Sequence, residues 1–236
     1  MIKPLDWDSN FFGIKTGRLD ASELSKEELQ NQLKSIDKSG FQLVYIFAGH
    51  DKPVLKKEIL ETGGKLVDEK ITYFMNLSGF KPLISEFIKS SHGADMDREL
   101  ESLALESGKY SRFRLDPQIP RNKFEDLYRL WMRNSLKGNF AKEVFTFEEM
   151  GRKLGMVSID IRNGEGWIGI IAVNEESRGK SIGKLLMHAC IRFCQENHVS
   201  VLNVQTQMEN KVSCAFYERI GFEVKCIEDV FHFWSV

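Results

Sequence analysis

The chain has 236 residues, of which 42% are hydrophobic and 28% are charged, as expected of a globular protein with a substantial core. Its formal net charge of −1 at pH 7 gives no electrostatic reason to expect nucleic acid or a membrane surface as a partner. The first seven residues lack the apolar segment of a signal peptide, and no stretch approaches about 18 uninterrupted apolar residues, so we expect a cytoplasmic protein.

The first 80 residues alternate between helical and extended patterns. The pattern predicts, in order, a helix over residues 25–38, a strand over 41–48, a helix over 52–61 and a strand over 65–77. Ser25 is followed three residues later by Glu28, which is the spacing of a capping box at the start of the first helix. Gly63 and Gly64 are suited to a left-handed stop after the second helix.

The polar, glycine-containing segment 90–95 is the best candidate for a domain boundary. We therefore predict two domains, residues 1–94 and residues 95–236. Residues 59–66 have the same helix–glycine–strand pattern as residues 217–224, with Ile59 in the place of Tyr217. The first domain is therefore interpreted as a smaller α/β half-copy of the second, without its tyrosine.

The second domain has an equally regular pattern. It predicts helices over 96–108 and 124–137, strands over 155–161 and 167–173, a helix over 181–197, a strand over 201–206, a helix over 211–220 and a strand over 223–234. Asn163-Gly164 between two extended runs predicts a hairpin. Residues 110–117 predict a loop that is rich in arginine and aromatic side chains. The four cysteines all lie in the last fifth of the chain without a C-x-x-C pair, which favours reduced thiols.

A strand that leads into a glycine-rich turn and then a helix is a candidate anion site. Here the apolar strand 167–173 is followed by Arg178-Gly179-Lys180-Ser181-Ile182-Gly183-Lys184 and the long helix. Backbone N–H groups at such a turn point outward, and the helix dipole favours negative charge there. The alternative is an ordinary structural turn, since Gly-Lys-Ser is common in loops.

A tyrosine follows one element later, in the frame Asn210-x6-Tyr217-x3-Gly221-Phe222. Tyrosine has an unperturbed pKa of about 10, so it is protonated at pH 7 and is able to give a proton to a leaving group. The alternative is a half-buried packing residue. The histidines show no paired metal-ligand spacing, and no metal is expected.

These two signatures, in this order, resemble the GNAT superfamily of N-acetyltransferases, whose pyrophosphate loop reads Arg/Gln-x-x-Gly-x-Gly/Ala. The resemblance implies a mixed, mostly antiparallel twisted sheet flanked by helices, with acetyl-CoA as the acyl donor. It also implies that strand 167–173 diverges from strand 201–206 and that Tyr217 protonates the departing thiolate. The residues that it implies in cofactor binding are Ile171, Ala172, Val173, Arg178, Gly179, Lys180, Ser181, Gly183, Lys184 and Asn210. Ser181 departs from the family's glycine, and we expect it to cap the helix and keep its N–H available.

Short segments at 5–13, 111–114 and 205–210 further resemble superfamily members that acetylate the amine of a dTDP-4-amino-4,6-dideoxyhexose, a nucleotide-linked amino sugar. Arg112 and Arg114 would then bind its phosphates. Asp68 is a candidate general base, with a solvated strand edge as the alternative. The resemblance also suggests a homodimer. A peptide, amino acid or other small amine is the alternative acceptor, and a non-catalytic acyl-CoA binding module is the alternative function.

Overall fold

The computed structural model describes residues 1–235, apart from the side chain of Asp37. The helices are α1 (Asp6–Phe12), α2 (Lys26–Ser39), α3 (Pro53–Glu61), α4 (Arg98–Ser107), α5 (Arg112–Leu115), α6 (Arg121–Leu136), α7 (Ile182–Glu196) and α8 (Lys211–Ile220), with one 3₁₀ turn, η1 (Glu175–Ser177). The strands are β1 (Lys3–Pro4), β2 (Thr16–Asp20), β3 (Leu43–Gly49), β4 (Lys65–Asn76), β5 (Ile88–Ser90), β6 (Glu143–Glu149), β7 (Arg152–Arg162), β8 (Glu165–Val173), β9 (Val201–Gln207) and β10 (Glu223–Trp234). None of the described helices is long and apolar enough to cross a membrane.

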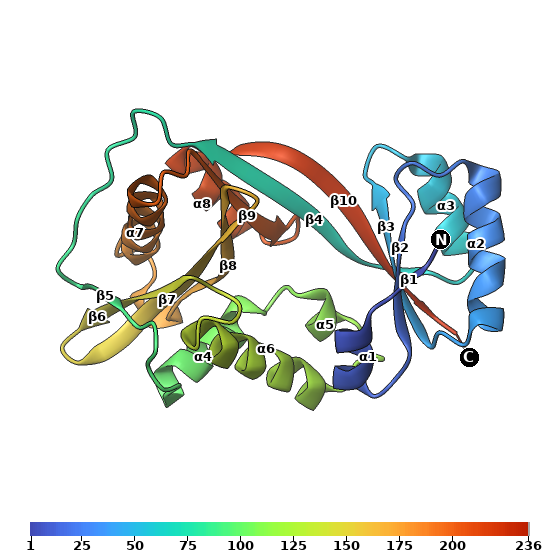
Figure 1. The fold of residues 1–236 in the computed structure, drawn as a ribbon, viewed down its shortest axis with the longest axis horizontal. Coiled ribbons are helices and arrows are strands. Elements are labelled where there is room, and N and C mark those ends of the chain that lie inside the picture. Colours follow the sequence, from blue (N-terminus) through green and yellow to red (C-terminus); the bar gives the residue numbers. More distant parts are fainter. Residues whose placement is uncertain (236) are drawn as a thin grey trace. The chain divides into compact units, whose positions relative to one another are not determined.

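The strands follow the order β1-β2-β3-β10-β4-β9-β8-β7-β6-β5 in a mixed sheet (Figure 1). The β2–β3 and β8–β9 pairs are parallel, whereas β1–β2, β3–β10, β5–β6, β6–β7 and β7–β8 are antiparallel. This arrangement confirms the predicted fold class of a mostly antiparallel sheet flanked by helices.

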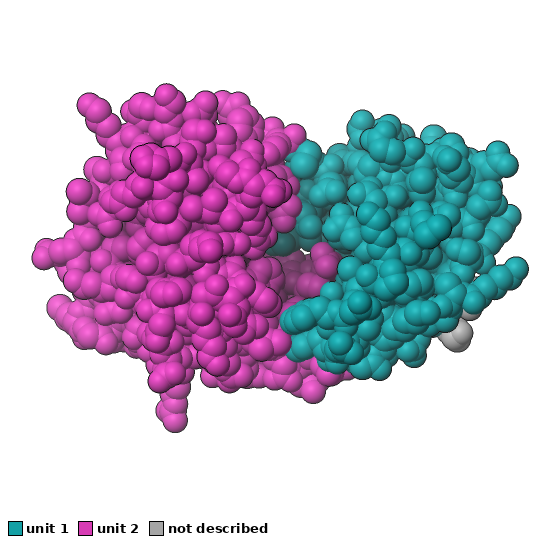
Figure 2. Space-filling view, in the orientation of Figure 1, with its two compact units in different colours: residues 1–71, 206–211, 226–236 teal, residues 72–205, 212–225 magenta. Residues whose placement is uncertain are grey.

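The chain folds into two compact units (Figure 2). The first comprises residues 1–71, 206–211 and 226–236, and the second comprises residues 72–205 and 212–225. Strands β4, β9 and β10 contribute to both units, because the chain passes between units within each of them. The predicted domain boundary after residue 94 stays a prediction. The first border between the two compact units lies after Ile71.

In the first unit, α2 and α3 share an apolar core with β2, β3 and β10. The core includes Leu19, Leu29, Ile36, Ile46, Ile59 and Phe231, all fully buried. The predicted capping box opens α2: Ser25 Oγ accepts from the N–H of Glu28, and the Glu28 carboxylate accepts from the N–H of Ser25. The sequence analysis missed α1 and β2, two short elements; α1 begins without a side-chain cap.

In the second unit, β6, β7 and β8 form a meander covered by α7 on one face and by α4 and α6 on the other (Figure 1). The predicted hairpin joins β7 to β8, with Asn163 and Gly164 both at positive φ, 52° and 79°, as a two-residue turn requires. The predicted helices and strands of residues 96–234 are confirmed to within a few residues at each end. Three elements differ from the prediction: β5 and β6 were not predicted, and α5 lies where a loop was expected.

Candidate functional site

Strands β8 and β9 of the second unit begin as a parallel pair and then diverge. Among the described residues they are paired only at Gly166–Leu202 and Trp167–Asn203, although β8 continues to Val173 and β9 to Gln207. The buried side chain of Asn203 closes the paired end by donating to Glu165 Oε2 at 2.9 Å and to the carbonyl of Gly166 at 3.3 Å. The carboxyl half of β8 therefore has an edge that β9 does not pair, as the resemblance predicted.

The orientation of the β8 amides follows from two hydrogen bonds to β7. The N–H of Ile170 donates to Ser158 Oγ at 3.0 Å, and the N–H of Asn174 donates to the carbonyl of Leu154 at 2.8 Å. Because backbone groups alternate along a strand, the N–H groups of Ile171 and Val173 point to the opposite, unpaired edge. Both amides therefore lie at the edge of β8 that β9 leaves unpaired, and their part in cofactor binding stays a prediction.

Ala172 lies between these two residues on β8. By the same alternation its N–H group points toward β7, and its side chain is buried. Ala172 therefore adds no N–H group to the unpaired edge. Its part in cofactor binding stays a prediction.

The turn after β8 presents backbone N–H groups at the start of α7. Gly179 has φ 79° and Ser181, the residue before the first turn of the helix, has φ 62° and ψ 10°. Ser181 makes no side-chain capping bond, so the prediction that its hydroxyl caps α7 is wrong. The first N–H groups of a 15-residue helix lack intrahelical partners and carry the positive end of the helix dipole. The turn has the features of an anion site.

Gly183 allows the start of α7 to pack closely against the two neighbouring elements. A Cβ at this position would lie 3.2 Å from Cζ of Phe216 on α8 and 3.8 Å from Cγ2 of Val173 on β8. The anion turn, the unpaired edge of β8 and helix α8 therefore meet at one point of the second unit.

Cationic side chains accompany the turn, but one of them is already paired. Arg178 Nη2 donates to Glu106 Oε1 of α4 at 2.6 Å, which ties the turn to that helix. Lys180 and Lys184 are exposed. An anion at the turn would thus meet two solvated ammonium groups and a guanidinium held by a carboxylate.

Tyr217 lies on α8 and is only 3% exposed. Its ring centroid is 5.3 Å from that of Phe216 and 5.8 Å from those of Tyr73 and Phe222. Burial in this aromatic environment raises the pKa of Tyr217 well above its usual value, so the hydroxyl stays protonated. The predicted packing role and the predicted proton-donor role are both compatible with this position.

Tyr73 of β4 is a neighbour that the sequence analysis missed. Its hydroxyl donates to Glu218 Oε1 at 2.9 Å, and burial together with this bond raises the pKa of Tyr73. No local motif marks it, because it is brought beside Tyr217 only by the fold.

The remaining predicted residues fall on three other segments. Asn210 directly precedes α8 and is half-buried. Asp68 of β4 is 8% exposed, so the alternative of a solvated strand edge is wrong. The guanidinium of Arg112 lies 4.4 Å from the ring centroid of Phe113, and that of Arg114 lies 5.7 Å from that of Phe124. Asp68 and Asn210 belong to the first unit, and the roles of all four stay predictions.

The sequence analysis also missed a cluster in the first unit, formed by His50, Glu69 and Asp229. These residues lie far apart in the sequence and share no spacing motif. One sequence signal was available. Because side chains alternate between the two faces of a strand, Asp229 lies on the same face of β10 as the core residue Phe231, which indicates a buried carboxylate.

Comparisons with known proteins agree with this geometry. The model of the acetyltransferase (GNAT) family matches residues 106–222. The chain is 26% identical over 132 residues to the spore coat polysaccharide biosynthesis protein SpsD of Bacillus subtilis, covering 56% of this chain and 45% of that protein. It is 33% identical over 93 residues to streptothricin acetyltransferase A of Bacillus subtilis, covering 39% of this chain and 54% of that enzyme.

Among solved structures, a tandem GNAT protein from the clavulanic acid biosynthesis pathway matches with a TM-score of 0.56 at 13% identity, covering 93% of this chain and 75% of that one. At this identity the likeness shows the fold alone, which is the GNAT fold. The chain spans about half the length of the two curated relatives, 45% and 54%.

Proposed function

We propose that this chain, a member of the acetyltransferase (GNAT) superfamily by its family match and fold, transfers an acetyl group from acetyl-CoA to an amine. The observation that carries the proposal is the meeting of three parts in the second unit: the unpaired edge of β8, the glycine turn at the start of α7, and helix α8, on which Tyr217 is the candidate proton donor. Each part meets one requirement of acyl transfer from a thioester.

Acetyl-CoA would be held by backbone groups more than by side chains. Its pyrophosphate suits the N–H groups of residues 179–183, where the helix dipole favours negative charge. Its pantetheine arm is itself a chain of amides, able to pair with the exposed edge of β8 as an added strand would. The thioester carbonyl would then lie near the N–H of Val173.

The reaction is a direct attack of the acceptor amine on the thioester carbonyl carbon. A C–N bond forms, and the carbonyl oxygen becomes an oxyanion, which the N–H of Val173 stabilises. The C–S bond then breaks, and the thiolate takes its proton from Tyr217. The amine loses a proton to a base, for which Asp68 is the candidate. The raised pKa of Tyr217 keeps the donor protonated throughout the neutral range.

The acceptor we propose is the amine of a nucleotide-linked amino sugar, a dTDP-4-amino-4,6-dideoxyhexose such as dTDP-fucosamine. Arg112 and Arg114 support this choice, because guanidinium groups oriented against aromatic rings suit a diphosphate. The relative SpsD is named for polysaccharide biosynthesis, which agrees with a sugar substrate. A second candidate is a small-molecule amine, which the relative named streptothricin acetyltransferase A favours.

The test is the release of free thiol from acetyl-CoA by the purified protein, with dTDP-4-amino-4,6-dideoxygalactose, its gluco epimer, or no acceptor. We expect release that depends on one of the two sugars. Release only with simple amines would move the assignment to the second candidate. Acetyl-CoA binding without release in the presence of any amine would identify a non-catalytic binding module.

Tyr217→Phe completes the test, because it removes only the hydroxyl. We expect kcat to fall by about 10²- to 10⁴-fold, the range typical of general-acid catalysis, with acetyl-CoA affinity retained. Tyr128→Phe is the matched control, since Tyr128 is a buried tyrosine of α6 in the same unit. An equal loss of kcat in both variants would contradict the assignment of Tyr217.

A further inference from the structure

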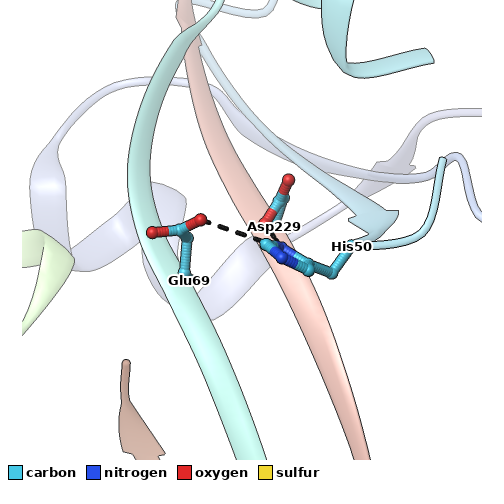
Figure 3. Close-up of side chains that lie close together, drawn as sticks. All are labelled: His50, Glu69 and Asp229. Atoms are coloured by element: carbon cyan, nitrogen blue, oxygen red, sulfur yellow. Dashed lines mark hydrogen bonds and ion pairs between the residues drawn. The ribbon is translucent and has the colours of Figure 1, made fainter. Parts of the chain in front are cut away.

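Three side chains with metal-binding atoms converge in the first unit, outside the proposed acetyl-transfer site (Figure 3). His50 Nδ1 lies 2.8 Å from Asp229 Oδ1 and 3.7 Å from Glu69 Oε1. One ligand atom from each of the three residues lies within 4.8 Å of the others. The cluster therefore offers one imidazole nitrogen and two carboxylate oxygens around a single point.

The sheet holds these side chains in place. His50 directly follows β3, and its N–H donates to the carbonyl of Ile227 on β10 at 3.2 Å. Asp229 pairs with Ala48 in the β3–β10 ladder and is fully buried. Glu69 lies on β4, the next strand in the sheet order. The residue that follows β3 and the strands β10 and β4 thus supply one ligand each.

The cluster carries an excess of negative charge. Lys56 of α3 lies 2.9 Å from Asp229 Oδ2 and 3.7 Å from Glu69 Oε1. One ammonium group therefore faces two carboxylate groups. A buried carboxylate such as Asp229 requires such compensation.

We propose that His50, Glu69 and Asp229 form a binding site for a divalent transition-metal ion of the Zn²⁺ type. Zn²⁺ accepts histidine nitrogen and carboxylate oxygen at about 2.0–2.2 Å, which in a tetrahedral arrangement separates ligand atoms by about 3.3–3.5 Å. The two separations from His50 Nδ1, 2.8 and 3.7 Å, lie on either side of this value. An imidazole ligand disfavours Ca²⁺ and Mg²⁺, which take oxygen ligands.

Lys56 fits the site as a partner of a ligand. Its ammonium group forms an ion pair with Asp229 Oδ2, whereas Oδ1 is the atom nearest His50. A metal-bound carboxylate commonly has a further polar partner of this kind. The bound ion would join β3, β10 and β4 in the first unit, with a fourth position left for water or a further ligand.

The test is a titration of the chelator-treated, full-length protein with Zn²⁺, followed by calorimetry. We expect one site per chain, and binding at least tenfold weaker in His50→Gln and in Glu69→Gln. His198→Gln, at an exposed histidine of the second unit, is the matched control and should leave binding unchanged.

Two outcomes would overturn the proposal: absence of Zn²⁺ binding in the wild-type protein, or binding that His50→Gln and Glu69→Gln leave unchanged. The side chains of His50 and Glu69 are 40% and 24% exposed, so both variants are expected to fold, which far-UV circular dichroism checks. Binding and folding are read directly, so the result is independent of acetyl transfer.

Discussion

Substitution of Ser181 tests the backbone conformation of the anion turn. The left-handed backbone predicts that glycine stabilises the protein at this position, whereas a helix-capping hydroxyl would predict that loss of the serine destabilises it. At φ 62° it occupies the left-handed region, which costs a residue with a Cβ about 1–2 kcal/mol. Glycine avoids that cost but loses about 0.4–1 kcal/mol through the greater freedom of the unfolded chain. Ser181→Gly should therefore stabilise the protein by about 0.5–1 kcal/mol.

Ser181→Ala separates this explanation from helix capping. Alanine keeps the Cβ and removes only the hydroxyl, which makes no capping bond in the structure. We expect a change within about 0.5 kcal/mol, whereas loss of a capping serine typically costs about 1 kcal/mol.

Thermal unfolding of the three proteins measures both effects. For a protein of this size, 1 kcal/mol corresponds to a shift in Tm of about 2–4 °C, so Ser181→Gly should raise Tm by about 1–4 °C. Its acetyl-CoA affinity should stay within about twofold of wild type, because the N–H donors keep their positions. A fall in Tm of 2 °C or more in Ser181→Ala, or any fall in Ser181→Gly, would refute the reasoning.

Two further predictions concern helix α7. Gly183→Ala places a Cβ 3.2 Å from the ring of Phe216, so we expect about 1–3 kcal/mol of destabilisation in urea unfolding. We also expect weaker acetyl-CoA binding. An unchanged affinity for acetyl-CoA would show that this close contact does not shape the site. Burial, and next the charge of Lys184, lower the pKa of His188, whose Nδ1 accepts from the N–H of Leu83 at 2.8 Å. The unfolded chain then binds the extra proton first, so this stabilisation is present above the unfolded pKa of about 6.5 and is lost as pH falls from there through the lower pKa of folded His188. The stability difference between wild type and His188→Gln should therefore shrink between pH 7.5 and 5.5, and a constant difference would contradict it.

The sequence predicted those elements whose signals are local. Ser25 and Glu28 lie at the capping-box spacing, and the structure shows both of their hydrogen bonds. Asn163-Gly164 predicted a two-residue turn, and both residues have positive φ. In each case the interaction joins residues close in the chain, so the amino-acid types alone determine it.

Predictions failed where the fold supplies the partner. Ser181 was expected to cap α7, but the left-handed backbone takes its hydroxyl out of capping geometry. Strand β5 has only three residues and depends on pairing with β6. The approach of Tyr73 to Tyr217 likewise depends on tertiary packing, which residue spacing does not encode.

Strand β10 has a consequence for how the chain is made. In the first unit it lies between β3 and β4, and its Phe231 belongs to the core that α2 and α3 cover. The ribosome synthesises α2, β3 and α3 long before residues 228–234, which pair with β3. During translation the first unit therefore waits with an open strand position, while the meander and helices of the second unit are already complete. Domains usually fold in the order of synthesis, but here the unit that starts first must finish last.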